Sequence, residues 1–190
     1  HKQRPGTPLH LYLPGPHRGI FNLPALQPSK EVILCEALLD ALTFWCAGFR
    51  QVTSAFGIEG FTEEMSEAFE AYGVERVLIA YDRDDAGEKA AVKLAERLKP
   101  KGIACHRVLF PRGMDANDYA RRVKPAERSL DLVLRQAQPM AGAGERPVRA
   151  LEVHELPASE VHEPKAETET RAAAKEETAL NETPATSAPV

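Results

Sequence analysis

The stretch that decides the fold is Tyr81-Asp82-Arg83-Asp84-Asp85-Ala86-Gly87, where an apolar run ends in acidic residues. The run before it, residues 75–81, is short and rich in branched side chains, so it predicts a buried strand. Carboxylates crowded behind a strand repel one another, and a divalent cation between them removes that repulsion. This stretch alone leaves two interpretations open: a metal site, or a solvated acidic turn that caps the following helix.

The segments on either side of this stretch alternate between strand-like and helix-like patterns. Short branched runs predict strands, and apolar residues three and four positions apart predict helices. The predicted strands are 31–35, 51–55, 75–81 and 103–110, and the predicted helices are 37–47, 62–72, 86–98 and 125–137. This order is typical of an α/β fold with a central parallel sheet of about four strands flanked by helices.

Local signals refine two of the predicted helices. Leu38, Ala41, Leu42 and Trp45 have the spacing of one helix face, so we expect that face to be buried. Asp85 directly precedes the helix 86–98 and is the expected N-cap, because aspartate accepts hydrogen bonds from the free amides of a first turn.

Acidic residues follow several predicted strands at the point where each strand ends. Glu36 follows the first strand, Asp82 and Asp84 follow the third, and Asp115 lies in the loop after the fourth. Sites in parallel α/β sheets form beyond the carboxyl ends of the strands, so these loops bring carboxylates to one edge. Oxygen ligands of this kind suit Mg²⁺. The pattern therefore favours the metal site over the capping turn.

Charge and composition divide the chain into a globular part and a tail. Residues 1–138 hold 19 Lys/Arg and 18 Asp/Glu, whereas residues 139–190 hold 5 and 10, which together give the net charge of −4. The tail is rich in Ala, Glu, Thr and Pro and lacks aromatic residues, so we expect it to be disordered. The predicted domains are a lead-in segment (1–29), an α/β domain (30–138) and the acidic tail (139–190).

The lead-in segment has the pattern of a small N-terminal hairpin. Weakly alternating residues 9–13 and 17–23 flank the turn-forming Pro14-Gly15-Pro16. Because the chain begins with His1 rather than Met, we expect it to be a fragment of a longer protein.

The remaining features point to a cytoplasmic protein. Cys35, Cys46 and Cys105 are widely spaced and form neither a metal pair nor a disulfide framework, which is typical of reduced thiols. No stretch is long and apolar enough to span a membrane, and no signal peptide opens the chain. We therefore expect no membrane partner.

Two motifs at the strand ends resemble the Toprim domain, the catalytic module of bacterial-type primases, topoisomerases and some nucleases. The first family motif is a strand, then Glu-Gly, then an Asp four residues after the Glu; here it stands as Val32–Asp40 (VILCEALLD). The second, Asp-x-Asp-x-Ala-Gly after a strand, is complete as Asp82–Gly87 (DRDDAG). The resemblance covers residues 30–122 and implies a Toprim-like, Rossmann-like sheet.

Within the family, the likeness is strongest to DNA primases and primase-like proteins of mobile elements. Residues 109–119 (LFPRGMDANDY) resemble the primase loop pattern of Leu-Pro, a Gly, and then paired acids, and residues 12–22 resemble a lead-in segment. The resemblance implies nucleotidyl transfer with two Mg²⁺ (or Mn²⁺) ions, making RNA primers from nucleoside triphosphates on single-stranded DNA. A replicative helicase is the implied partner of a longer chain, and this fragment alone could be inactive.

The resemblance also assigns roles to individual residues. Glu36, Asp82 and Asp84 are the expected catalytic set, with Glu36 as a metal ligand or general acid/base. Asp115 joins these three as a metal ligand. The supporting residues are Asp40, Asn117 and Asp118, and the nucleotide or nucleic-acid contacts are Arg83 and Arg112.

Two departures from the family pattern bear on this site. Ala37 replaces the Gly that usually follows the catalytic Glu, so the approach of the backbone there is altered. Asn117 stands where primases often have a second Asp. An amide neutralises less charge than a carboxylate, so we expect a second cation to bind more weakly unless Asp118 compensates.

Two other functions remain open at this point. A Toprim-type nuclease or topoisomerase-like module could use the same carboxylates to activate water or to cleave a strand. A non-catalytic nucleic-acid-binding module is the third hypothesis, and the pair Asp82 and Asp84 argues against it, because a purely structural domain has little reason to keep two acids that repel.

Overall fold

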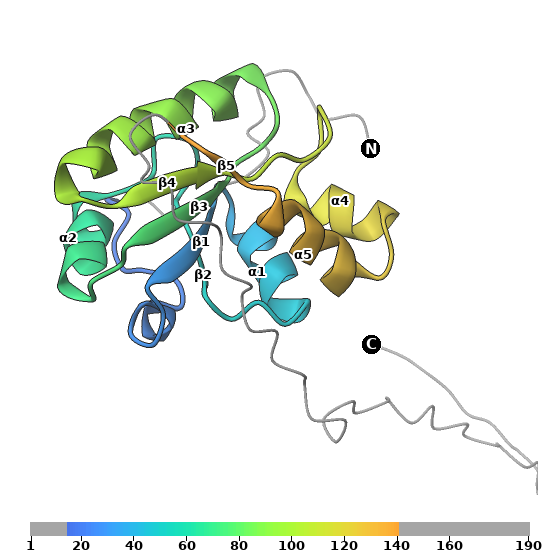
Figure 1. Ribbon diagram of the computed structural model, residues 1–190. Helices are drawn as coiled ribbons and strands as arrows, with labels where there is room; N and C mark the ends of the chain where they lie inside the picture. The colour runs from blue at the N-terminus through green and yellow to red at the C-terminus, as the bar shows by residue number, and fades with distance from the viewer. Residues whose placement is uncertain (1–14, 141–190) are drawn as a thin grey trace, which may run out of the picture. The chain divides into compact units, whose positions relative to one another are not determined.

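The structure, a computed structural model, describes residues 15–140. A mostly parallel five-stranded sheet is covered by helices on both faces (Figure 1). The elements in chain order are η1 (Leu23–Leu26), β1 (Glu31–Cys35), α1 (Leu38–Cys46), β2 (Val52–Ser54), α2 (Glu63–Ala71), β3 (Arg76–Ala80), α3 (Asp85–Leu98), η2 (Lys99–Lys101), β4 (Ala104–Arg107), α4 (Ala116–Arg122), α5 (Ala126–Arg135) and β5 (Gln138–Pro139).

The strand order β2-β1-β3-β4-β5 places β1 and β3 side by side in the centre of the sheet. Their parallel register runs from Glu31 opposite Arg76 to Cys35 opposite Ala80. Strands β2 and β4 pair in parallel on the outer sides of these two, and β5 adds an antiparallel edge. The loops that follow β1 and β3 therefore leave the sheet at the same edge, next to each other.

Two apolar cores form because consecutive strand residues face opposite sides of the sheet. Val32, Leu34, Val77 and Ile79 pack with α2 and α3 on one face, and the intervening strand residues pack with α1, α4 and α5 on the other. The whole of β1 is buried, which explains its uninterrupted apolar sequence.

Glycine at position 87 is required by a close approach of the backbone. A Cβ there would collide with the carbonyl oxygen of Asp82, because the first turn of α3 packs directly on the preceding loop. The Ala-Gly pair of the second motif therefore lets α3 begin immediately after the acidic stretch.

The N-cap of α3 lies one residue earlier than the sequence predicts. Asp84 caps the helix, and its Oδ1 accepts a hydrogen bond of 2.7 Å from the N–H of Gly87. Asp85, the predicted cap, is the first helical residue. At the start of α2, the predicted cap Thr62 accepts a hydrogen bond from the N–H of Met65.

The predicted buried face of α1 is wrong in part. Leu38 and Leu42 are 45% and 37% exposed, whereas Asp40 and Phe44 are buried together with Ala41. The reason is tertiary: α4 packs on α1 and covers the face that carries Asp40. A polar side chain thereby occupies a position that periodicity alone assigns to solvent.

The lead-in segment differs from its prediction where the structure describes it. Residues 17–23 contain no strand, and the chain instead enters the 3₁₀ helix η1 with Pro24 in its first turn. The first strand of the predicted hairpin and the acidic tail lie outside the described residues.

The end of the domain contains two elements that the sequence did not predict. The loop after β4 turns into helix α4, and β5 pairs with β4 through His106 opposite Pro139. The sheet therefore has five strands rather than about four.

Cys35 and Cys105 are buried free thiols and Cys46 is an exposed one. No helix of the described part is long and apolar enough to cross a lipid bilayer.

Candidate functional site

The candidate site lies where β1 and β3 end. Glu36 directly follows β1, Asp82 and Asp84 follow β3, and Asp115 precedes α4. Backbone hydrogen bonds join the β3 loop to the loop after β4, because the N–H of Gly113 donates to the carbonyl of Arg83 at 3.2 Å. The topology therefore brings the loops after three neighbouring strands to one edge.

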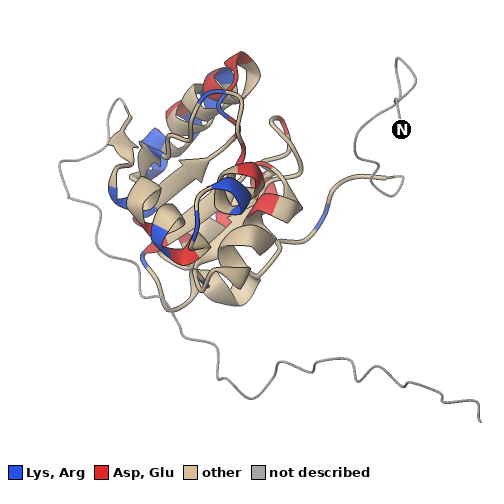
Figure 2. Cartoon of the chain, turned by 90° about the vertical axis from the view of Figure 1, so that its right-hand side faces the viewer, with Lys and Arg blue, Asp and Glu red and all other residues tan. Residues whose placement is uncertain are grey.

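Acidic and basic segments of the chain both occur on one side of the domain. Figure 2 looks onto the side that lies at the right in Figure 1, where segments bearing Asp or Glu and segments bearing Lys or Arg lie next to one another. This side of the domain is thus not of a single charge sign.

Glu36 has a buried carboxylate oxygen at this edge of the sheet. Its Oε2 is buried and has no hydrogen-bond partner among the described residues. Burial and then repulsion by Asp82 raise the pKa of Glu36 to about 7, and Asp84 adds to the increase. A hydrogen bond from the backbone N–H of Asp82 and the charge of Arg107 act in the opposite direction. The carboxyl group can therefore gain or lose a proton near neutral pH.

Asp40 lies one turn further along and is buried between α1 and α4. Its Oδ1 accepts a hydrogen bond of 3.2 Å from the N–H of Asn117. Burial and then repulsion by Asp115 raise the pKa of Asp40 to about 7, with smaller contributions from Asp82 and Glu36. Asp40 therefore belongs electrostatically to the same acidic group and also anchors the start of α4.

Asp84 and Asp115 share a local role as helix N-caps. Oδ1 of Asp84 accepts from Gly87, and Oδ1 of Asp115 accepts from the N–H of Asp118 at 2.6 Å. Free amides and the positive end of a helix stabilise such carboxylates. Each side chain keeps a second oxygen, Oδ2, that these caps do not use.

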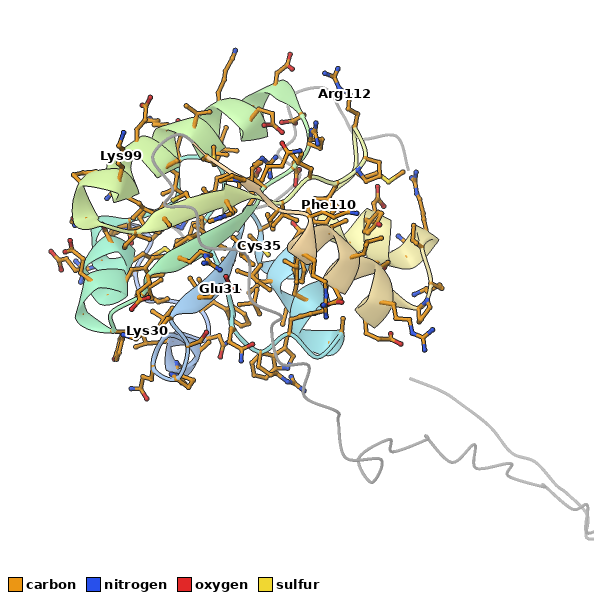
Figure 3. All side chains as sticks on the ribbon, in the orientation of Figure 1. Lys30, Glu31, Cys35, Lys99, Phe110 and Arg112 are labelled. Carbon is orange, nitrogen blue, oxygen red and sulfur yellow. The ribbon has the colours of Figure 1, made fainter. Side chains whose placement is uncertain are left out.

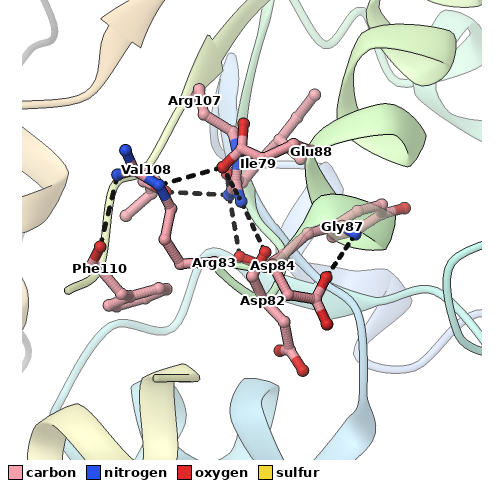
Figure 4. Close-up of polar contacts among 10 residues, drawn as sticks. Ile79, Asp82, Arg83, Asp84, Gly87, Glu88, Arg107, Val108 and Phe110 are labelled. Carbon is pink, nitrogen blue, oxygen red and sulfur yellow. Dashed lines mark hydrogen bonds and ion pairs between the residues drawn. The ribbon is translucent and has the colours of Figure 1, made fainter. Parts of the chain in front are cut away.

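Sequence reasoning missed Arg107, which is only 4% exposed although it carries a charge. Its Nη1 donates to the carbonyl oxygens of Ile79, Tyr81 and Val108, and its Nη2 donates to the carbonyl of Asp82 at 2.8 Å (Figure 4). The only sequence signal is an arginine within the apolar run of the fourth strand. These carbonyls satisfy the donors on both terminal nitrogens, whereas Nε is buried without a hydrogen-bond partner among the described residues.

Glu88 links two arginines at this edge. Its Oε1 lies 3.0 Å from Nη2 of Arg107 and 3.2 Å from Nε of Arg83. The Nη1 of Arg83 also lies 3.4 Å from the carbonyl oxygen of Phe110. Arg83, predicted to contact nucleic acid, is therefore partly engaged within the domain.

The other predicted residues are placed in different ways. Arg112 is exposed and projects from the loop between β4 and α4 (Figure 3). The amide Nδ2 of Asn117 donates to Oγ1 of Thr43 at 2.9 Å, so this side chain helps to join α4 to α1. Asp118 lies 3.7 Å from Arg122 on the next turn of α4.

The contacts of these side chains test whether they fit a metal ion. Within residues 15–140, no three His, Cys, Asp or Glu side chains are grouped closely enough to hold one ion as they stand. The buried, unpartnered Oε2 of Glu36 and the surrounding carboxylates nevertheless supply the oxygen donors that Mg²⁺ prefers. The residues therefore fit a hard divalent cation in their chemistry, without forming a finished cage.

Comparisons with known proteins agree with this fold. Residues 33–120 match the sequence profile of a family described as Toprim-like. The DNA primase of Staphylococcus epidermidis is 30% identical over 97 residues, which is 51% of this chain and 16% of that protein. The chain spans less than a fifth of the length of the first two curated relatives that it matches.

Two solved structures extend the comparison. A DNA primase domain from Pseudomonas aeruginosa aligns with a TM-score of 0.53 and 25% identity, covering 63% of this chain and 39% of that one. A DnaG primase catalytic domain bound to single-stranded DNA aligns with a TM-score of 0.54 over 64% of this chain and 39% of that one; its 20% identity shows the fold alone. Residues 33–120 therefore match the Toprim-like family, and this part of the chain is similar to a part of DNA primases.

Proposed function

We propose that this domain is the Toprim part of a primase-like protein and takes part in metal-dependent synthesis of RNA primers on single-stranded DNA. The observation that carries the proposal is the buried Oε2 of Glu36, which has no partner among the described residues and lies within an acidic group at the strand ends. A fold tolerates such a group when its function requires a cation there. The similarity to primases supplies the reaction type.

Glu36, Asp82 and Asp84 are the residues that would hold the metal, with Asp115 on the neighbouring loop. When bound, two divalent ions would neutralise phosphate charge and favour the attacking 3′ hydroxyl. Asp82 and Asp84 are presented by the short loop between β3 and α3, and Glu36 by the end of the adjacent strand. The central pair of strands thus sets the spacing of the three carboxylates.

Glu36 has a second role in this proposal. Because its pKa is raised to about 7, its carboxyl group can accept a proton from a hydroxyl group and release it again near neutral pH. A bound cation would favour the charged form, so the same group can act as a ligand. Asp40 and Asn117 hold α4 against α1 and so support the loop that carries Asp115.

The remaining partners follow from the same similarity. Arg112 is exposed beside the site and is a candidate for phosphate contact, and Arg83 would have to leave Glu88 to make one. Nucleoside triphosphates and single-stranded DNA are the proposed substrates, and a replicative helicase is a proposed partner. Other segments, corresponding to the rest of the curated relatives, would supply further template contacts.

Metal binding is the first test, with Asp131→Asn as the matched control. Asp131 pairs with Arg135 on α5, away from the site. Calorimetric titration of the chain with Mn²⁺ should show binding that falls by about tenfold or more in Glu36→Gln and Asp82→Asn, because each change removes a charged ligand. The control should bind as the unaltered chain does. Equal binding by all four proteins, or by none, would overturn the proposed metal site.

Product analysis separates the proposed reaction from its alternatives. The chain is incubated with labelled nucleoside triphosphates, single-stranded DNA and Mg²⁺ or Mn²⁺. Short labelled RNA that disappears in Glu36→Gln supports primer synthesis. Shortened DNA instead assigns the same carboxylates to a nuclease. DNA binding that is unchanged in Glu36→Gln, with neither product, favours a non-catalytic binding module.

A further inference from the structure

We propose that Arg107 is a positioning residue that holds the loop carrying Asp82 and Asp84 in place for metal binding. This inference rests on the proposed function, because it concerns how the same site is kept in shape. Its guanidinium group donates mainly to backbone carbonyls around the end of β3.

The contacts of Arg107 span the point at which β3 ends and the acidic loop begins. Nη1 lies 3.1 Å from the carbonyl oxygen of Ile79 and 2.9 Å from that of Tyr81. Nη2 lies 2.8 Å from the carbonyl oxygen of Asp82. Ile79 lies near the end of β3, whereas Tyr81 and Asp82 are the first two residues after the strand. One side chain therefore fixes the exit of the backbone from the sheet.

Glu88 closes the arrangement from the helix side. Its Oε1 accepts from Nη2 of Arg107 at 3.0 Å and comes from the first turn of α3. The loop between the strand and the helix is thus held at both of its ends by the same guanidinium group (Figure 4). The carbonyl of Asp82 is itself the first anchor point, and Asp84 lies in the chain between it and Glu88, so the placement of both carboxylates depends on Arg107.

The chemistry of this arrangement requires arginine rather than lysine. A guanidinium group is planar and carries donors on separate nitrogens, so it can serve carbonyls in several directions at once. A lysine ammonium keeps the charge but presents all donors from one atom. Lysine at position 107 would therefore leave some buried carbonyls of the strand end without a donor, even though the net charge is unchanged.

A second buried arginine offers a control for a merely structural role. Arg76 begins β3 and donates to Oε2 of Glu31 at 2.7 Å, and both side chains are about as buried as that of Arg107. Arg76 lies at the opposite end of the same strand from the acidic loop. Its loss should weaken the sheet without acting on Asp82 directly.

The first experiment measures amide hydrogen exchange of the whole chain by NMR without metal, under conditions where each variant is folded. Arg107→Lys should accelerate exchange at the amides of Gly87 and Glu88 by about tenfold relative to those of the central strands, since it removes buried hydrogen bonds from the loop. Arg76→Gln should leave this ratio unchanged. An unchanged ratio in Arg107→Lys, or an equal increase in Arg76→Gln, would overturn the inference.

A milder variant covers the case in which Arg107→Lys does not fold. Glu88→Ala removes one anchor from a half-exposed position, and Glu96→Ala on the exposed side of the same helix is its control. We expect Glu88→Ala to accelerate exchange of the Gly87 amide by about threefold and the control to have no effect. Absence of an effect in Glu88→Ala would contradict the two-ended anchoring.

Titration with Mn²⁺ then separates the two proposals. If the unaltered chain binds Mn²⁺, Arg107→Lys should weaken binding by about tenfold while Arg76→Gln leaves it intact. Equal binding by the Arg107 variant would overturn the link to the metal. If the unaltered chain binds no Mn²⁺, the proposed function fails, and the exchange data still decide whether Arg107 positions the loop.

Discussion

The two ends of the central strand pair carry the same kinds of side chain in opposite arrangements. At the start of β1 and β3, Glu31 and Arg76 lie opposite each other and form one buried ion pair of 2.7 Å. At the other end, Glu36 has a buried oxygen without a partner, and the nearby guanidinium group of Arg107 is directed to backbone carbonyls. Figure 3 shows Glu31 and Cys35, which precedes Glu36, at the two ends of β1.

The two glutamates, Glu31 and Glu36, differ in the charges that surround them. Burial raises the pKa of Glu31, but the hydrogen bond and charge of Arg76 oppose that increase. Burial and then repulsion by Asp82 and Asp84 raise the pKa of Glu36 to about 7, and the charge of Arg107 opposes this increase only in part. The charge of Glu31 is therefore matched by that of Arg76, although Oε1 of Glu31, like Oε2 of Glu36, is buried without a hydrogen-bond partner among the described residues. The second end has an excess of negative charge that a cation would offset.

The largest effect on stability should come from breaking the ion pair of Glu31 and Arg76. Glu31→Gln leaves Arg76 buried without its carboxylate, so we expect the free energy of unfolding to fall by about 3 kcal/mol. Glu36→Gln should instead raise the stability of the metal-free chain at pH 8, because it removes a charge that the fold does not compensate. Urea unfolding measures both.

The exposed pair of Lys30 and Glu75 provides the control for that experiment. These side chains are 66% and 53% exposed, so Glu75→Gln should change stability by less than about 1 kcal/mol. A loss in Glu36→Gln as large as that in Glu31→Gln would show that the two ends are energetically alike, contrary to this comparison.

The raised pKa of Asp40 should make the free energy of unfolding depend on pH. The pKa of Asp40 is raised to about 7 from an ordinary value of 3.8, so the folded chain binds its proton more tightly than the unfolded chain. The stabilising effect is complete below about pH 4 and is lost as the pH rises through 7. Asp40→Asn should remove this contribution, on the order of 2 kcal/mol between pH 4 and 8.

Comparing Asp40→Asn with the unaltered chain isolates this contribution from that of His106. Burial lowers the pKa of His106, which makes stability fall as the pH drops below about 6.5, and both proteins share this effect. Unfolding is measured without divalent ions across the pH range. Identical slopes for the two proteins would mean that Asp40 bears no excess charge in the fold.

The smallest change in stability should come from Asp84→Asn. Asparagine caps helices about as well as aspartate, so the start of α3 should lose less than about 0.5 kcal/mol. The charge is nevertheless lost, and Mn²⁺ binding should weaken. Thr62→Ala is the converse control, because it removes the cap of α2 and should cost about 1 kcal/mol without affecting Mn²⁺. Unchanged Mn²⁺ binding in Asp84→Asn would restrict this residue to capping.

The regular part of the domain could be predicted because its signals are local. Buried β1 is an unbroken apolar run, and α3 has apolar residues on one face with Gly102 in a left-handed conformation after its end. The motif around Asp82 also has its predicted context, a strand followed at once by a helix. The roles of the predicted site residues stay predictions.

The errors arise where one element decides the environment of another. Leu38 and Leu42 follow a helical period but are exposed, because α4 covers the face with Asp40 and Phe44. Asp84 rather than Asp85 caps α3, because the backbone turns into the helix one residue earlier than expected. Neither outcome can be read from spacing, which does not tell where a neighbouring helix will pack.

The sequence by itself determined the order of strands and helices and therefore the edge at which the acidic loops meet, since parallel strands joined by helices all end on one side. Only the tertiary structure decided which charges are compensated there. Arg107 follows Tyr81 by 26 residues and Asp82 by 25 residues in the chain, yet its donors reach the carbonyl oxygens of both. Burial and partners depend on contacts between distant segments, and these set the pKa of Glu36.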